Sequence, residues 1–111
     1  MNWHKITEEV QVEEIKQVSH NRPVMILKHS TTCSISATAL ARLERSWKDD
    51  QAGRLQPYYL DLLKYRSISK KIADTFNVEH ESPQILIIKD GKSVYDASHF
   101  DIRFDEIISK M

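Results

Sequence analysis

The chain of 111 residues has the length of one domain, and 41% of its residues are hydrophobic, which is enough for one modest core. Sixteen basic and sixteen acidic residues cancel without long blocks of like charge, which argues against nucleic acid as a partner. No apolar run approaches the roughly 18 residues of a membrane helix, and Glu8 and Glu9 interrupt the region where a secretion signal would be apolar. We therefore expect a single cytoplasmic domain over residues 1–111, without a membrane partner.

The N-terminal part of the chain predicts a helix followed by a buried strand. After a short strand near residues 3–6, Thr7 can cap a helix that runs to about Ser19. The nearly continuous apolar run 23–28 is typical of a strand that is buried on both faces. We expect this strand to be the central one of a sheet.

The central strand leads into a second helix through Cys33, the only cysteine of the chain. Leu40, Leu43 and Trp47 recur on one side of this helix, which is expected from about Ser34 onward. The cysteine therefore lies at a junction between a strand and a helix.

The next two elements predict a further strand and a further helix. Aromatic strand formers indicate a strand over 55–61. Ile68, Ile72 and Phe76 stand four residues apart and form one apolar helical stripe, which Asn77 can end.

The C-terminal part predicts a hairpin and a last helix. The apolar runs 84–89 and 92–97 are separated by Asp90-Gly91, which favours a type I′ turn with positive φ at both positions. Asp101 is expected to cap a final helix with the apolar residues Ile102, Ile107 and Ile108. Alternating strands and helices imply parallel pairing, and the hairpin adds antiparallel strands. The expected fold is therefore α/β and thioredoxin-like, with a mixed central sheet flanked by helices on both faces.

Cys33 is the candidate catalytic residue. A single cysteine excludes an internal disulfide and multi-cysteine zinc sites, so redox chemistry must use a disulfide shared with another molecule. A helix N-terminus stabilises the thiolate, which is the nucleophilic form, and a thiol of lowered pKa also leaves faster from a mixed disulfide. The alternative is a small buried cysteine without chemistry, which is commoner in general. The position between strand and helix favours the nucleophile.

Two histidines and one proline complete the candidate site. His29 lies four residues before Cys33 and His80 three residues before Pro83, so both are candidate proton or hydrogen-bond partners of the thiol. Sequence statistics alone favour a trans peptide bond before Pro83, whereas a thioredoxin-like fold favours a cis bond there. The remaining histidines show no mutual metal-ligand spacing, so we expect no metal.

Two segments resemble the monothiol bacilliredoxins of the bacillithiol system (the YtxJ type), within the thioredoxin-like superfamily. The segments read Lys-His-Ser-Thr-Thr-Cys-Ser-Ile-Ser over 28–36 and His-Glu-Ser-Pro-Gln over 80–84. The resemblance implies a bacterial enzyme that removes bacillithiol from client proteins, with bacillithiol as thiol co-substrate and no bound cofactor. It places Cys33 as the attacking thiol and assigns five residues to substrate binding: Thr32, Ser34, Ser36, Ser82 and Pro83.

Ser36 stands where the second cysteine of a Cys-x-x-Cys pair would be, so no intramolecular resolving step is available. A monothiol cycle with an external low-molecular-weight thiol is therefore favoured. Two alternatives stay open: a monothiol glutaredoxin-like carrier of an iron–sulfur cluster, and a binding module in which Cys33 is inert. A thiol peroxidase is disfavoured because Ser30 replaces the threonine of the Thr-x-x-Cys motif.

Overall fold

The strand β2 (Val24–His29) lies at the centre of a five-stranded sheet, and all six of its residues are buried. The computed structural model describes residues 1–111. The strand order is β1-β3-β2-β4-β5, where the other strands are β1 (His4–Lys5), β3 (Gln56–Asp61), β4 (Gln84–Lys89) and β5 (Lys92–Ser98). β2 pairs in parallel with β3 and antiparallel with β4. The mixed sheet predicted from the order of elements is confirmed.

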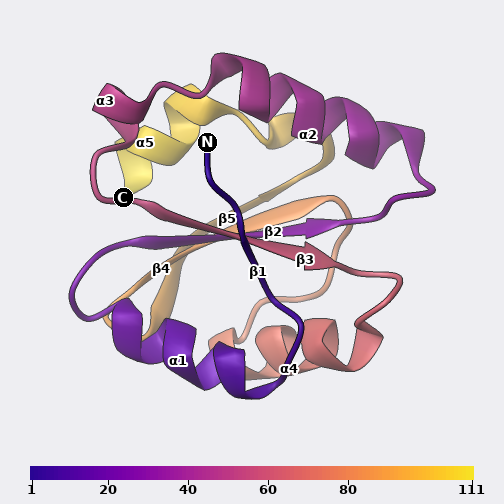
Figure 1. Cartoon of the computed structure of the whole chain (residues 1–111), viewed down its shortest axis with the longest axis vertical. Coiled ribbons are helices and arrows are strands. Elements are labelled where there is room, and N and C mark those ends of the chain that lie inside the picture. The colour runs from indigo at the N-terminus through magenta and orange to yellow at the C-terminus, as the bar shows by residue number, and fades with distance from the viewer.

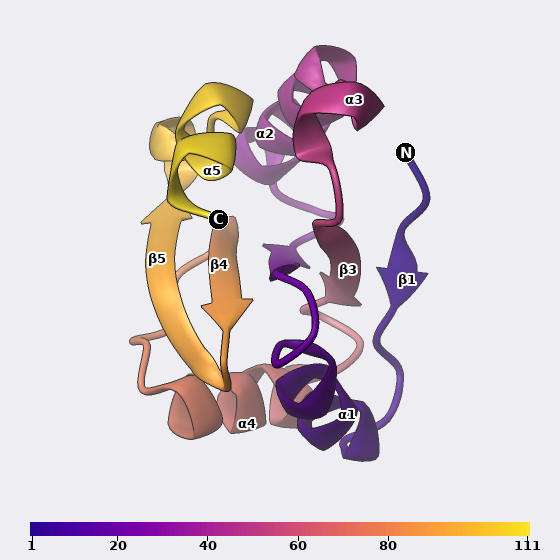
Figure 2. The ribbon, with the colours of Figure 1, turned by 90° about the vertical axis from the view of Figure 1, so that its left-hand side faces the viewer.

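Helices cover both faces of this sheet (Figures 1 and 2). One face carries α2 (Ser34–Ser46), α3 (Asp49–Ala52) and α5 (Phe104–Lys110), and the other carries α1 (Val10–Val18) and α4 (Arg66–Phe76). Each face has its own apolar core, because successive side chains of a strand point to opposite faces. Met25 and Leu27 of β2 belong to the α2 side, whereas Val24 and Ile26 belong to the α1 and α4 side.

The turns that the sequence predicts are confirmed by their backbone angles. Asn77 ends α4 in the left-handed conformation, with a φ of 55°. Asp90 and Gly91 have φ values of 51° and 77°, as a type I′ hairpin turn requires. The register of β2 against β4 then pairs Lys28 with Gln84, so the segment before β4 and the loop after β2 lie at the same end of the sheet.

The prediction that Thr7 caps the first helix was wrong. α1 begins at Val10, and Glu9 precedes it in a helical conformation without a side-chain cap. Instead, the side chain of Gln11 folds back, and its Oε1 accepts hydrogen bonds from the amides of Thr7 at 2.7 Å and Glu8 at 2.9 Å. A side chain inside the helix therefore satisfies two amides that precede the helix.

The prediction that Asp101 caps the last helix was also wrong. Asp101 ends a 3₁₀ turn, η1 (His99–Asp101), and α5 starts only at Phe104. The extended residues between them bury Ile102 completely against the α2-side core. Burial of one apolar side chain thus interrupts the helical pattern. The short helix α3 was not predicted, because four residues are too few for a periodic signal.

Candidate functional site

Cys33 occupies the N-cap position of α2. Its backbone is extended (φ −102°, ψ 122°), and its carbonyl accepts the hydrogen bond of the Ala37 amide at 3.0 Å. The thiol is free, half-buried and makes no capping hydrogen bond. The sulfur is thus held at the start of a helix of 13 residues, where unpaired amides and the helix dipole favour an anion.

The predicted site residues around Cys33 fall into two groups. Thr32 and Ser34 are exposed on either side of the cysteine, so their hydroxyls are available to a ligand. Ser36, one turn further along α2, is 1% exposed. Its hydroxyl forms hydrogen bonds with other groups of the protein.

Ser36 links the helix to the end of β2. Its Oγ accepts a hydrogen bond from the amide of Ser30 at 3.0 Å and lies 2.7 Å from Nδ1 of His29. Burial lowers the pKa of His29, although the carboxylates of Asp61 and Glu44 oppose this, so the neutral ring is favoured. Since Oγ already accepts one hydrogen bond, we assign its O–H as the donor to Nδ1, which requires the Nε2–H tautomer.

Ser36→Ala is expected to lower the free energy of unfolding by about 1.5 kcal/mol, because it leaves two buried polar groups unpaired, the Ser30 amide and His29 Nδ1. Urea unfolding followed by circular dichroism measures this loss. Ser34→Ala is the matched control, because Ser34 is exposed in the same helical turn and should change stability little. Equal stability of the two variants would show that the Ser36 network contributes nothing.

The Ser82-Pro83 peptide bond is cis, and it immediately precedes β4. Pro83 is buried, and its carbonyl accepts a hydrogen bond from the His99 amide at 3.0 Å. The Ser82 hydroxyl is buried and has no hydrogen-bond partner. The structure therefore fixes the proline segment against η1, at the same end of the sheet as Cys33.

His29 and His80 lie on opposite faces of the sheet. His29 contacts α2 through Ser36, and its ring lies 5.6 Å from the ring of Tyr59. His80 contacts the α4 side instead, with Nδ1 at 3.2 Å from Ser69 Oγ. The structure thus brings His29, but not His80, into the hydrogen-bond network of the helix that Cys33 begins.

Lys28 is a residue whose partners the sequence did not indicate. Its side chain is completely buried, and Nζ donates a hydrogen bond to the Ser69 carbonyl at 3.1 Å. Nζ also lies 3.4 Å from His80 Nδ1. The only signal in the sequence is a charged residue at the end of an otherwise apolar strand.

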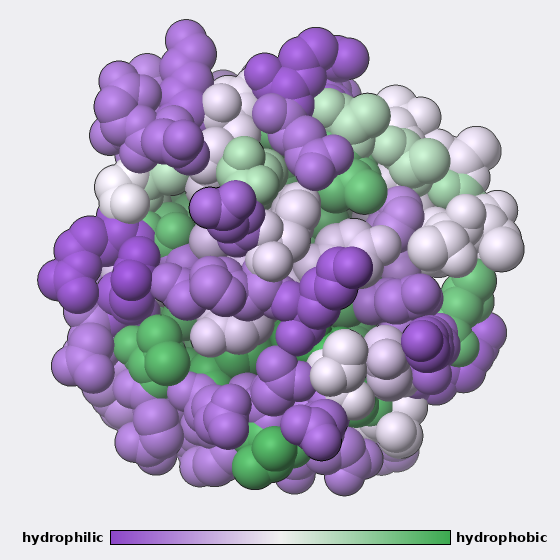
Figure 3. Space-filling view, in the orientation of Figure 1, coloured by the Kyte–Doolittle hydropathy of each residue, from purple (hydrophilic) through white to green (hydrophobic).

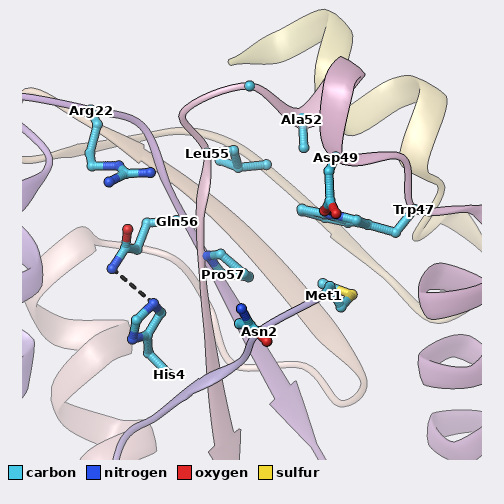
Figure 4. A pocket seen from close by; sticks show the side chains of 11 residues that line it. Met1, Asn2, His4, Arg22, Trp47, Asp49, Ala52, Leu55, Gln56 and Pro57 are labelled. Atoms are coloured by element: carbon cyan, nitrogen blue, oxygen red, sulfur yellow. Dashed lines mark hydrogen bonds between the residues drawn. The ribbon is translucent and has the colours of Figure 1, made fainter.

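A cavity of about 410 Å³ lies at the opposite end of β3, beside the N-terminus (Figure 4). Its lining includes Arg22, Trp47 and the Gln56–His4 hydrogen bond of 3.0 Å, but no residue near Cys33. The face that Figure 3 shows is largely hydrophilic, with small separate hydrophobic patches. No cluster of three or more His, Cys, Asp or Glu side chains that could hold a metal ion is present. None of the helices combines the length and the apolar composition of a membrane-spanning segment.

Comparison with solved structures defines the class of protein. A candidate oxidoreductase with a thioredoxin fold is 32% identical, with a TM-score of 0.81 over 96% of this chain and 90% of that one. The thioredoxin of Malassezia sympodialis is 14% identical, with a TM-score of 0.78 over 97% of this chain and 89% of its own. The thioredoxin of Fasciola hepatica is 16% identical, with a TM-score of 0.70 over 96% of each chain. The protein is a thiol oxidoreductase of the thioredoxin fold.

Residues 4–107 match the family model of the monothiol bacilliredoxin BrxC. The chain belongs to this monothiol bacilliredoxin family.

Proposed function

We propose that this protein removes bacillithiol from mixed disulfides of client proteins, with Cys33 as its nucleophile. The observation that carries the proposal is the free, half-buried thiol at the N-cap of α2, in a chain of the bacilliredoxin family with no second cysteine. Its partners are then bacillithiolated proteins and a small thiol in the bacterial cytoplasm.

The proposed reaction has two exchanges. The Cys33 thiolate attacks the bacillithiol sulfur of the mixed disulfide, a Cys33–bacillithiol disulfide forms, and the client leaves as a thiolate that takes up a proton. A second small thiol, as its thiolate, then attacks the bacillithiol sulfur. This step forms a low-molecular-weight disulfide and returns the Cys33 thiolate.

The surroundings of Cys33 support both exchanges. Helix N-termini favour anions, and Cys33 lies at the N-terminus of α2, where its sulfur carries the negative charge before the first exchange and after the second. Thr32 and Ser34 flank the sulfur with exposed hydroxyls. We assign Ser82 and Pro83 to holding the extended small thiol through their backbone, and Ser36 to positioning the start of α2 through its bonds to β2.

The experiment offers one client protein in two forms, bacillithiolated and glutathionylated, to the wild type and to Cys33→Ala. Intact-mass spectrometry should show bacillithiol moving from the client to Cys33 in the wild type and no transfer in the variant. Equal removal by Cys33→Ala would overturn the mechanism. Equally fast removal of glutathione would overturn the preference for bacillithiol. A coloured cluster after anaerobic reconstitution would instead support the iron–sulfur carrier, and slow alkylation of Cys33 the inert binding module.

A further inference from the structure

Lys28 is an exception to the rule that buried charged side chains are paired with an opposite charge. It is completely buried in the central strand, and no carboxylate lies within 4.0 Å of its ammonium group. Burial lowers its pKa from 10.5 to about 8, so the side chain is still mostly protonated at neutral pH. A buried cation without a counter-ion destabilises a fold, and such exceptions are expected at functional positions.

The ammonium group joins three elements of the fold. Lys28 belongs to β2, its Nζ donates to the Ser69 carbonyl of α4, and it lies within hydrogen-bond distance of His80 in the segment between α4 and β4. Ser69 Oγ lies beside the same imidazole nitrogen at 3.2 Å. His80 therefore contacts the sheet through Lys28 and α4 through Ser69.

The segment that His80 anchors has few other restraints. No backbone–backbone hydrogen bond involves residues 79–82, and Ser82-Pro83 follows directly. Side-chain bonds from Gln84 to the Glu79 carbonyl at 2.9 Å and from Lys28 to His80 hold its start. Gln84, the register partner of Lys28, also has a buried Oε1 without a partner. The side chains of Lys28, Ser69 and Gln84 therefore supply the hydrogen-bond contacts that hold the start of this segment.

The bond from Lys28 requires a neutral His80, because Nδ1 can accept only when it is unprotonated. Desolvation and the Lys28 ammonium lower the pKa of His80, Arg66 of α4 acts in the same direction, and Glu81 opposes them. Glu81 also faces His99 of η1 at 3.9 Å. At neutral pH the imidazole is thus neutral, and we assign it the Nε2–H tautomer, in which Nδ1 accepts from Lys28. Protonation of the ring would set two like charges against each other.

We propose that Lys28 is a positioning residue of the substrate site, which holds the segment 79–83 through a hydrogen bond to neutral His80. This inference rests on the proposed function, in which Ser82 and Pro83 bind the small thiol. Protonation of His80 breaks the bond and frees the segment. Substrate binding then weakens without any change at Cys33, because only part of the population keeps the binding conformation.

The test compares Lys28→Met and His80→Asn with the wild type. Asparagine carries Oδ1 at the branch position of Nδ1, so His80→Asn keeps an acceptor that cannot be protonated. We expect the KM for a bacillithiolated client to rise about fivefold in Lys28→Met at neutral pH, with kcat and the alkylation rate of Cys33 unchanged. The wild-type KM should rise similarly between about pH 7.5 and pH 5, whereas His80→Asn should keep a flat profile.

A second readout does not need activity. The pKa of His80, followed by NMR, should rise in Lys28→Met, and amide hydrogen exchange of residues 79–82 should accelerate about fivefold while the exchange of α2 stays unchanged. Wild-type KM and pH profile in Lys28→Met would overturn the positioning role. If the wild type fails to act on any bacillithiolated client, the proposed function is wrong. An unchanged His80 pKa with unchanged exchange would refute the Lys28 bond itself.

Discussion

Ser36→Cys is expected to convert the proposed monothiol cycle into a dithiol one. Positions 33 and 36 are separated by one turn at the start of α2, and residues three apart on a helix have Cβ atoms about 5–6 Å from each other. This spacing is close to what a disulfide needs after a small adjustment of the first turn. After Cys33 has taken up bacillithiol, the new thiolate attacks Cys33 and releases bacillithiol as its thiolate.

The intramolecular attack should dominate, because a tethered thiol has an effective concentration far above that of a small thiol in solution. We expect the steady-state amount of the Cys33–bacillithiol adduct to fall by about tenfold or more, with a protein disulfide in its place. Non-reducing intact-mass spectrometry distinguishes the added mass of bacillithiol from the loss of two hydrogens. Ser34→Cys is the control, because adjacent side chains on a helix do not face each other, and its adduct should persist. A wild-type level of adduct in Ser36→Cys would contradict the prediction.

Lys28→Met is expected to raise the free energy of unfolding by about 2 kcal/mol at neutral pH. The pKa of Lys28 falls from 10.5 in the unfolded chain to about 8 in the fold, which corresponds to about 3 kcal/mol of charging cost. Loss of the hydrogen bonds to Ser69 and His80 offsets roughly 1 kcal/mol of this gain. Methionine has nearly the same shape and carries no charge, so the strand should pack as before.

The pH dependence of the free energy of unfolding tests separately whether the charge of Lys28 destabilises the fold. Between about pH 8 and pH 10.5 the unfolded chain still holds the Lys28 proton that the folded protein has lost, so wild-type stability rises with pH in this window. Lys28→Met lacks this contribution, and its advantage should therefore shrink as pH rises from 8. Urea unfolding of both proteins across this range measures the difference, in which the shared titration of tyrosines cancels. A variant that is less stable than the wild type at neutral pH would show that the ammonium stabilises the fold.

Stability and substrate binding would then change in opposite directions. Lys28→Met should make the protein more stable globally while it loosens the segment 79–83 locally. Without a positioning role, loss of the Lys28 charge would still raise stability but would leave the segment 79–83 and substrate binding unchanged. The local loosening of this segment is therefore what identifies Lys28 as a positioning residue.

Much of the fold could be predicted from local signals. The apolar run of β2 predicts the central strand, and Asp90-Gly91 predicts the hairpin, because each feature restricts the backbone wherever it occurs. The capping predictions for Thr7 and Asp101 failed for a shared reason. In each case a neighbouring side chain intervenes: Gln11 binds the amides of Thr7 and Glu8, and Ile102 is buried in the core.

The order of residues is enough to place one thiol between a strand and a helix, and to show that Ser36 leaves it without an internal partner. Which groups share a face of the sheet follows from the packing of distant segments. Lys28 reaches Ser69 across 41 residues and His80 across 52, and neither pairing has a local pattern. Successive side chains of β2 point to opposite faces of the sheet, so His29 contacts α2 whereas its neighbour Lys28 contacts α4. Packing of α4 against the sheet brings Ser69 next to both Lys28 and His80, at the segment that leads to Pro83.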